Sequence, residues 1–378
     1  MSVTGQETQE LTATRRVPRP EVVVWDLTYA CPLRCSHCYS ESGRRPSRQL
    51  EHADMLRLAE ALVSLGPRVV AFSGGEPMLV PRIAEPARLL ADAGIRTSIN
   101  TSGWVTNRRL IGTVAETFDE VLVSLDGATA EVHDRIRGRA GSFARVMKTL
   151  GILDELAADR AARGRPRLWF GTDCVVVRTN FGHLERFATE IAPRFPRLCF
   201  LSFNAVVPEG LASRREFEEH ELLEEAQAAR LTDERTRARL RELAPDSVQV
   251  FTLDNLDLMM RPDQPTHRER IPLMLLEPDG EVRGIPVYEG TVGNLLHEPA
   301  AEVWQRSVAR WDDPFVLSVL AGIRTRREWG EAVRTLDLHF GSDDVRARIA
   351  RRSVRFDPPE FAGHLGPSLP HRTVNRTA

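Results

Sequence analysis

The sequence predicts an α/β protein built on a parallel sheet. From Glu21 onward, short runs rich in β-branched residues alternate with longer helical patterns, which is typical of βα units whose strands lie parallel. The chain has 378 residues, of which 42% are hydrophobic and 28% charged, and this composition is that of a folded enzyme. A doubly wound sheet and a partial barrel both fit the alternation, and right-handed crossovers are expected in either.

Six βα units are expected between residues 21 and 210. The strands are predicted from short apolar, β-branched runs and the helices from longer patterns between them. The predicted strands are 22–27, 69–73, 96–100, 120–126, 168–177 and 198–205. The predicted helices are 51–65, 83–93, 106–118, 143–158 and 183–191.

The pattern changes after Gly210, and we predict a domain boundary there. Residues 214–243 form a charge-dense helical pattern, and several prolines then interrupt the chain, namely Pro262, Pro265 and Pro272. We expect four segments, which are a disordered leader at 1–20, a core at 21–210, an extension at 211–355 and a disordered tail at 356–378.

Within the extension, a hairpin is predicted over residues 274–282. Its turn is the Pro-Asp-Gly at 278–280, which lies between apolar runs. Helices are expected at 301–311 and 314–336, because a proline is tolerated at the first position of the second one.

Charge and cysteine content exclude several classes of protein. The 51 basic residues nearly balance the 53 acidic ones, so the net charge of -2 gives no attraction to nucleic acid or anionic membrane. No window approaches the roughly 18 apolar residues of a membrane span, and no early stretch reads as a signal peptide. Five cysteines in a chain of this length do not form a disulfide framework. We therefore expect a cytoplasmic protein with no nucleic-acid or membrane partner.

Three of the cysteines lie together in a loop after the first predicted strand. Cys31, Cys35 and Cys38 are spaced Cys-x3-Cys-x2-Cys, and such a loop can wrap three thiolates around one metal centre. Zinc is one interpretation, with His37 or a distant residue as the fourth ligand. A [4Fe-4S] cluster is another, and three thiolates would leave one iron open to a small ligand. An iron that can bind a small ligand indicates a catalytic cluster.

A second motif, Gly74-Gly75-Glu76-Pro77, follows the second predicted strand. Two glycines let the backbone approach a ligand closely, and the Glu76 carboxylate can accept a charge-assisted hydrogen bond from an ammonium group. Taken alone, the motif is more often a tight strand-to-helix turn, but its position 36 residues after Cys38 favours the functional interpretation.

The combination resembles the radical SAM superfamily, whose hallmark is this cysteine loop after the first strand of a partial (βα)6 barrel. Ser124-Leu-Asp-Gly127 and His133-Asp-Arg-Ile-Arg137-Gly138 are similar to blocks of the subgroup that includes peptide-modifying enzymes and sulfatase maturases. The resemblance implies a partial (βα)6 TIM-type barrel at 21–210, one [4Fe-4S] cluster on Cys31, Cys35 and Cys38, and S-adenosylmethionine (SAM) on the open iron. Reduction would cleave SAM to a 5′-deoxyadenosyl radical.

The resemblance also implies which residues contact SAM. Glu76 would bind the methionyl ammonium, while Ser124 and Arg137 would hold the ribose and the carboxylate, which suits the planar fork of arginine. A polar turn is the alternative for Asn100, a surface charge for Arg137 and a helix cap for Asn180. The full set is Gly74, Gly75, Glu76, Pro77, Asn100, Ser124, Arg137 and Asn180.

The C-terminal part resembles a SPASM domain without its auxiliary iron-sulfur clusters. The segments 277–286 and 293–304 carry the resemblance, but Ile285 stands where a cysteine usually precedes the proline, and no cysteine follows Cys199. Cys174 and Cys199 lie in strand patterns and are expected to be buried structural thiols. One cluster per chain is therefore expected.

These expectations lead to a functional prediction. Only about 20 residues precede the first strand, too few for a cobalamin-binding domain or for the leader-peptide recognition domain of many peptide maturases, which argues for a small metabolite. Without an auxiliary cluster to accept an electron, decarboxylation or epimerisation is favoured over dehydrogenation. We expect a carbohydrate- or nucleoside-like substrate in bacterial secondary metabolism such as antibiotic biosynthesis, with flavodoxin or ferredoxin as reductant. The alternatives are modification of a ribosomal peptide and a zinc-binding interaction module, and no residue is predicted to act on the substrate.

Overall fold

The computed structural model describes residues 19–256 and 273–352. Most of the predicted leader, the whole predicted tail and the segment with Pro262, Pro265 and Pro272 lie outside the described residues.

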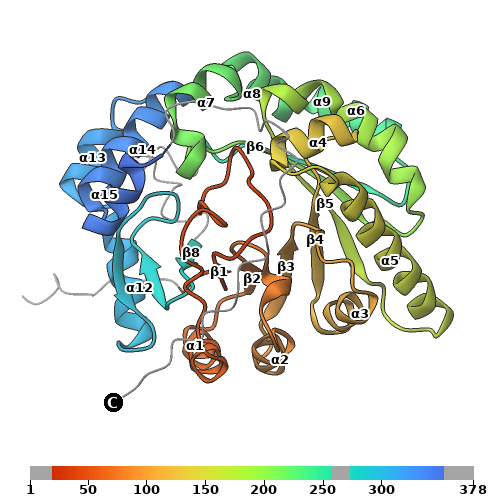
Figure 1. The fold of residues 1–378 in the computed structure, drawn as a ribbon, viewed down its shortest axis with the longest axis horizontal. Helices are drawn as coiled ribbons and strands as arrows, with labels where there is room; N and C mark the ends of the chain where they lie inside the picture. Colours follow the sequence, from red (N-terminus) through yellow and green to blue (C-terminus); the bar gives the residue numbers. More distant parts are fainter. Residues whose placement is uncertain (1–18, 257–272, 353–378) are drawn as a thin grey trace, which may run out of the picture.

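A ten-stranded sheet runs through the described residues in the order β10-β9-β8-β1-β2-β3-β4-β5-β6-β7. Every pairing from β8 to β7 is parallel, and the pairings of β8 with β9 and of β9 with β10 are antiparallel. The sheet curves into an open arc, as in a partial barrel (Figure 1). The strands of the core are β1 (Val22–Asp26), β2 (Val69–Ser73), β3 (Arg96–Thr101), β4 (Glu120–Ser124), β5 (Trp169–Val176) and β6 (Phe200–Ala205).

Helices of the core cover the outer face of the arc, and the loop after β1 lies on its inner side (Figure 1). These helices are α1 (His52–Leu65), α2 (Ala84–Asp92), α3 (Arg108–Thr117) and α5 (Ser142–Ala162). The predicted helix at 183–191 is a succession of short turns that includes α6 (Leu184–Arg186) and a π-helical stretch at Phe187–Ile191. One short helix of the core, α4 (Ala130–Arg137), was not predicted.

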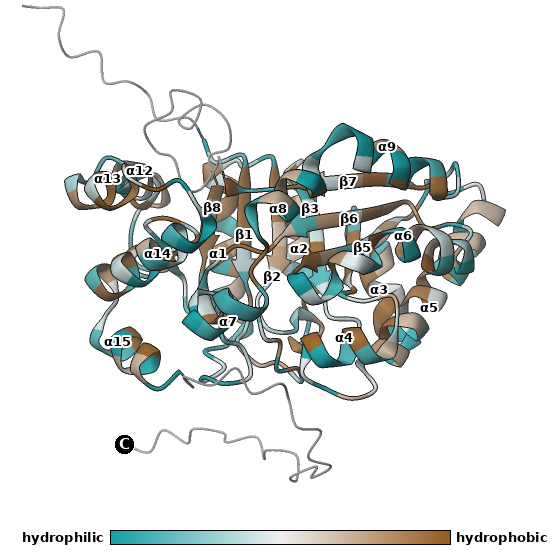
Figure 2. Cartoon of the chain, turned by 90° about the horizontal axis from the view of Figure 1, so that it is seen from above, coloured by the Kyte–Doolittle hydropathy of each residue, from teal (hydrophilic) through white to brown (hydrophobic). Residues whose placement is uncertain are grey.

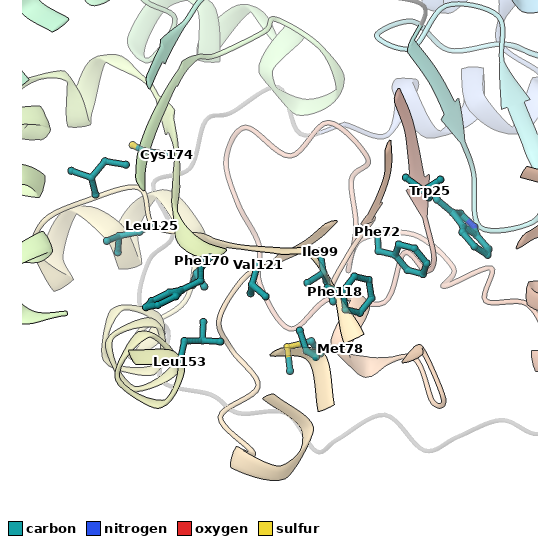
Figure 3. Close-up of a cluster of buried hydrophobic side chains, with 14 of the residues drawn as sticks. Trp25, Phe72, Met78, Ile99, Phe118, Val121, Leu125, Leu153, Phe170 and Cys174 are labelled. Carbon is teal, nitrogen blue, oxygen red and sulfur yellow. The ribbon is translucent and has the colours of Figure 1, made fainter. Parts of the chain in front are cut away.

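The main hydrophobic core lies between the sheet and these outer helices. Trp25, Phe72, Ile99, Val121 and Phe170 belong to it, and Figure 3 shows how they line up from strand to strand. Because side chains alternate along a strand, the residues next to the core positions face the inner side of the arc. The inner face is therefore polar at the carboxyl ends of the strands, where it carries Asp26, Ser73, Asn100, Ser124, Asp173 and Asn204.

The part of the chain beyond residue 210 completes both edges of the sheet. β7 (Gln249–Leu253) pairs with β6, and β8 (Leu273–Leu276) pairs with β1. The predicted hairpin is confirmed, since β8 pairs with β9 (Glu281–Arg283) through Leu276 and Val282. The parallel pairing of β8 with β1 was not predicted, because a four-residue strand carries no local signal of a distant partner.

Helices from the extension lie beyond both ends of the arc (Figures 1 and 2). The single helix predicted at 314–336 is instead two helices, because Thr325 and Glu328 form a capping box that starts a new one. No helix in the described part of the chain has the length and apolar character to span a bilayer. The remaining elements are α7 (Arg215–His220), α8 (Glu225–Thr232), α9 (Glu234–Leu243), β10 (Thr291–Asn294), α12 (Ala300–Arg310), α13 (Pro314–Leu320), α14 (Arg326–Phe340) and α15 (Asp343–Ala350).

A buried ionic cluster holds the extension together beside β1. The guanidinium of Arg283 lies 2.9 Å from the carboxylate of Glu277 and 3.6 Å from that of Glu289. Glu289 also pairs with Arg348. Burial alone would raise the pKa of Glu289, but the positive charges of Arg283 and Arg348 hold it well below its usual range. Ile285, where the SPASM resemblance would imply a cysteine, packs in a second hydrophobic cluster with Val316, Leu320 and Trp329.

We predict that Arg283→Ala lowers the free energy of unfolding by about 3–5 kcal/mol, because it removes the buried counter-charge that the carboxylates of Glu277 and Glu289 share. Arg306→Ala is the matched control, since it also removes an arginine paired with a glutamate, but at the surface; it should change stability little. Urea unfolding of the three proteins measures the difference. Equal losses in the two variants would contradict the role of Arg283.

Candidate active site at the cysteine loop

The cysteine loop leaves β1 and is held against the end of α4. The backbone N–H groups of Arg34 and Ser36 donate to the carbonyls of Arg137 and Ile136, each at 3.0 Å. Gly138 ends α4 in a left-handed conformation, and a Cβ there would lie 2.3 Å from the carbonyl oxygen of Arg34. Only glycine therefore allows this close contact.

The loop also rests on the turn after β2. The N–H groups of Gly75 and Glu76 donate to the carbonyls of Thr28 and Ala30, at 2.6 and 2.9 Å. A Cβ on Gly75 would lie 2.2 Å from the Ala30 oxygen, so a side chain would push the loop away. Pro77 is buried and begins a short 3-10 turn. This motif thus fixes the position of the cysteine loop.

The three loop cysteines are free thiols that influence one another's charge. Cys35 is buried, and Cys31 and Cys38 are half-buried. Burial raises the pKa of Cys31, and the neighbouring Cys35 and Cys38 raise it further. Burial raises the pKa of Cys35 to about 11, and the Arg137 charge opposes this rise. Among the described residues, no three His, Cys, Asp or Glu side chains are placed to bind a single metal ion.

Asp126 is the centre of the charged network beside the thiols. Its Oδ2 lies 2.7 Å from Nε of Arg137 and 2.9 Å from Nε2 of His37, and its Oδ1 accepts from the N–H of Val175 at 3.0 Å. Asp126 is fully buried. Burial alone would raise its pKa, but Arg137 and then His37 hold it well below the usual range. His37, suggested by the zinc interpretation as a fourth ligand, is turned toward Asp126.

Arg137 links this network to the cysteines. It is buried, and its Nη1 lies 3.8 Å from the sulfur of Cys35 while its Nε faces Asp126. Asp126 and Cys35 thereby fix the orientation of the guanidinium. The surface-charge alternative for Arg137 is wrong, and its predicted contact with a carboxylate of SAM stays a prediction. Asp126 was not among the predicted site residues, although its place in the Ser-Leu-Asp-Gly block could have indicated a role in the site.

Glu76 is occupied by groups of the chain itself. Its carboxylate accepts from Met78 N at 3.0 Å, from Thr101 Oγ1 at 2.8 Å, from Ser102 N at 2.8 Å and also from Ser102 Oγ. A carboxylate has about four acceptor positions, so this arrangement leaves none for an ammonium group. The geometry favours the turn alternative, in which Glu76 ties the β2 turn to the end of β3.

Asn180 likewise uses its amide within the chain. Its Nδ2 donates to the carbonyls of Asp126 and Val175, both at 2.9 Å, and its Oδ1 accepts from Val177 N at 2.8 Å. The side chain is fully buried. This geometry therefore favours the capping role of Asn180 over the predicted contact with the cofactor.

Other polar groups on the inner face do lack a partner. Oδ1 of Asn100 and Oδ2 of Asp26 are buried and accept no hydrogen bond from the described residues. Buried acceptors are rarely left unsatisfied, so both fit a ligand that brings donors. Ser124, at the end of β4, is half-buried on the same face. The three thiols, the arginine beside them and these free acceptors together fit a negatively charged cluster and a polar cofactor.

Asp173 and Asn204 extend the polar face to β5 and β6. Nδ2 of Asn204 donates to Asp173 at 2.6 Å and to Ser202 Oγ at 3.0 Å. Burial raises the pKa of Asp173 to about 6, although the hydrogen bond from Ser202 opposes this rise. A carboxyl group with this pKa can exchange a proton near neutral pH. Cys174, the neighbour of Asp173, points instead into the core behind the sheet (Figure 3), and Cys199 is also fully buried, as predicted.

Comparison with known proteins agrees with this site. The model of the radical SAM superfamily matches residues 25–160, which contain the cysteine loop, the β2 turn and the Asp126–Arg137 network. Members of this superfamily use a [4Fe-4S] cluster and SAM.

Two curated relatives and one solved structure show the range of proteins to which this chain is similar. Fe-coproporphyrin III synthase of Methanosarcina barkeri is 27% identical over 89% of this chain and 86% of its own length. PqqA peptide cyclase of Ruegeria pomeroyi is 32% identical over 54% of this chain, which spans only 52% of that relative. The crystal structure of Streptococcus suis SuiB bound to S-adenosylmethionine superimposes with a TM-score of 0.60 at 15% identity, over 80% of this chain and 68% of SuiB.

The likeness to SuiB is one of fold, since the sequence identity is low. The family match covers the cysteine loop and the network that holds it, and the superfamily is one of enzymes. The chain therefore carries a radical SAM domain over residues 25–160 and is an enzyme of the radical SAM type.

Proposed function

We propose that Cys31, Cys35 and Cys38 bind one [4Fe-4S] cluster and that the enzyme uses SAM there to modify a peptide. The observation that carries the proposal is the set of three free thiols on one loop beside the buried Arg137–Asp126 pair, at the mouth of a polar inner face. When bound, the cluster and SAM supply a radical that removes a hydrogen atom from the substrate.

The residues around the thiols suit a centre with negative charge. Binding iron requires thiolates, whose formation burial opposes at Cys31 and Cys35, so iron must displace the protons. The Arg137 charge 3.8 Å from the Cys35 sulfur favours the thiolate and offsets the charge that the ligands bring. Asp126 keeps this guanidinium in place and ionised.

SAM would lie on the inner face next to the loop. Oδ1 of Asn100 is a buried acceptor without a partner there, which suits a hydroxyl or ammonium donor of the cofactor. Ser124 and Arg137 remain the proposed contacts for the ribose and carboxylate. Glu76 and Asn180 support the site indirectly, because they hold the β2 turn and the end of β5.

For the substrate, the relatives favour the peptide alternative over the small carbohydrate-like metabolite expected from the sequence. PqqA peptide cyclase carries a peptide substrate in its name and is 32% identical over 54% of this chain. Asp173 is the proposed acid or base on the substrate side, because it lies on the inner face and has a pKa of about 6. A second candidate is decarboxylation of a porphyrin side chain, since Fe-coproporphyrin III synthase matches 89% of this chain and 86% of its own length.

We predict that Cys35→Ala abolishes iron retention and SAM cleavage. The matched control is Cys199→Ala, which removes a buried thiol that donates to the backbone carbonyls of Leu168 and Arg197 and should keep both properties. Iron per chain and 5′-deoxyadenosine formation with dithionite are measured after anaerobic reconstitution. Full SAM cleavage by Cys35→Ala would refute the metal assignment.

We predict that Glu76→Gln lowers the free energy of unfolding by about 1–3 kcal/mol, because an amide cannot accept from all four donors. Glu85→Gln, at an exposed carboxylate, is the control and should have no measurable effect. The proteins are unfolded by urea without the cluster, and SAM affinity is measured by calorimetry with it. Weaker SAM binding at unchanged stability would instead restore the direct contact first expected for Glu76.

The substrate proposal is tested with deuterated candidates in anaerobic assays. The probes are peptides encoded beside the gene, iron-coproporphyrin III and a nucleoside sugar, and mass spectrometry follows deuterium into 5′-deoxyadenosine. We expect transfer from a peptide. Transfer only from iron-coproporphyrin III, with loss of carbon dioxide, would replace the peptide by the second candidate, and transfer only from the sugar would restore the metabolite prediction.

A further inference from the structure

Several arginines contact the backbone of the cysteine loop from outside the site. Arg34 donates through Nη1 to the carbonyls of Cys31, at 3.1 Å, and Leu33, at 2.7 Å. Nη2 of Arg44 donates to the carbonyl of Arg34 at 2.7 Å, and Nη1 of Arg139 donates to that of Pro32. Consecutive carbonyls between the first two cysteines are thus capped by guanidinium groups.

A fourth arginine joins this group through a tryptophan. The guanidinium groups of Arg139 and Arg145 both lie 4.1 Å from the centre of the Trp104 ring. Nη1 of Arg145 also donates to the carbonyl of Trp104 at 3.0 Å. We call Arg34, Arg44, Arg139 and Arg145 the arginine collar.

The collar is a local excess of positive charge on a chain whose net charge is -2. Its guanidinium groups bind carbonyls and a ring, and within residues 19–256 and 273–352 none of them forms an ion pair with a carboxylate. Partial burial lowers the pKa of Arg139, and the charges of Arg34 and Arg145 lower it further, so these cations lie near one another. By contrast, exposed arginines on the helices are commonly paired, as Arg57 is with Asp54 and Arg186 with Glu190.

The two sides of the cysteine loop differ. Cys35 is buried and faces Arg137, whereas Arg34, the residue before it, is exposed, as are Arg44 and Arg145. A molecule that binds the exposed arginines therefore contacts the loop that carries the thiols without entering the polar inner face.

We propose that the arginine collar is the docking surface for an acidic one-electron carrier protein, an inference that rests on the cluster assignment of the proposed function. An acidic partner would gain complementary charge and faster association. On this surface it lies against the cysteine loop, so the path for the electron is short. The reduced carrier loses one electron, the cluster gains it and passes from the 2+ to the 1+ state, and no atom is transferred.

The test cancels the net positive charge of the collar without altering the site. The variant is Arg44→Glu with Arg145→Glu, and the control is Arg88→Glu with Arg109→Glu, which makes the same change in net charge at two exposed arginines of α2 and α3. The single change Arg145→Gln is a milder variant in case the double change disturbs the loop. The probes are a flavodoxin and an acidic [2Fe-2S] ferredoxin.

Carrier binding to the holoenzyme is measured by surface plasmon resonance at low and high salt. Cluster reduction by the reduced carrier, or by dithionite, is followed as loss of visible absorbance. We expect the collar variant to bind at least one carrier about tenfold more weakly and to be reduced correspondingly more slowly by it, with dithionite reduction unchanged. The control should match the native protein, and Arg145→Gln should show a smaller loss.

Three results would overturn the proposal. One is equal carrier binding by native protein and collar variant, or no carrier binding by either. Another is equal loss in the control, which would mean a response to net charge alone. The third is unchanged carrier binding with lost affinity for the substrate peptide, which would make the peptide the occupant of the collar. A chain that fails to hold any cluster would instead refute the proposed function, and iron analysis detects that outcome separately.

Discussion

The buried ion pair between Asp126 and Arg137 is the interaction on which the rest of the site depends. Removing either charge would leave the other in a fully buried position, which costs several kcal/mol. The pair joins four parts of the chain, because Asp126 follows β4 and accepts from the end of β5, while Arg137 ends α4 and contacts Cys35. The backbone of α4 then holds the cysteine loop through the carbonyls of Ile136 and Arg137. One ion pair thus sets the position of the loop that would bind the metal.

The two faces of the sheet separate stability from chemistry. The face toward the helices is apolar from Trp25 to Phe170, and this core fixes the strands. The inner face collects polar groups at the carboxyl ends of the same strands, where parallel α/β folds place their ligands. The extension adds strands at both edges of the sheet. Buried ion pairs around Arg283 hold it together. In this chain, charged residues and the packed Ile285 occupy the region for which the SPASM resemblance would imply cysteines.

Local patterns were sufficient to predict much of this fold. The strand at 69–73 and the boundaries of α1, α2 and α3 agree with the structure to within two residues, because each has a clear hydrophobic period. The short helix α4 and the pairing of β8 with β1 were missed, since their stability comes from distant contacts. The same limit applies to the site. The partners of Glu76 include Thr101 at the end of β3 and Ser102 just after it, and those of Asn180 include the Asp126 carbonyl. These surroundings could not be inferred from the residues' own motifs.

The most direct test of this account is Mössbauer and electron paramagnetic resonance spectroscopy of the anaerobically reconstituted protein, with and without SAM labelled at its methionyl group. We expect one four-iron cluster per chain. One of its irons should change its spectroscopic signal when SAM is added and should couple to the label. The cluster assignment would be contradicted by four equivalent irons whose spectra do not change on addition of SAM, or by zinc in place of iron at the three cysteines.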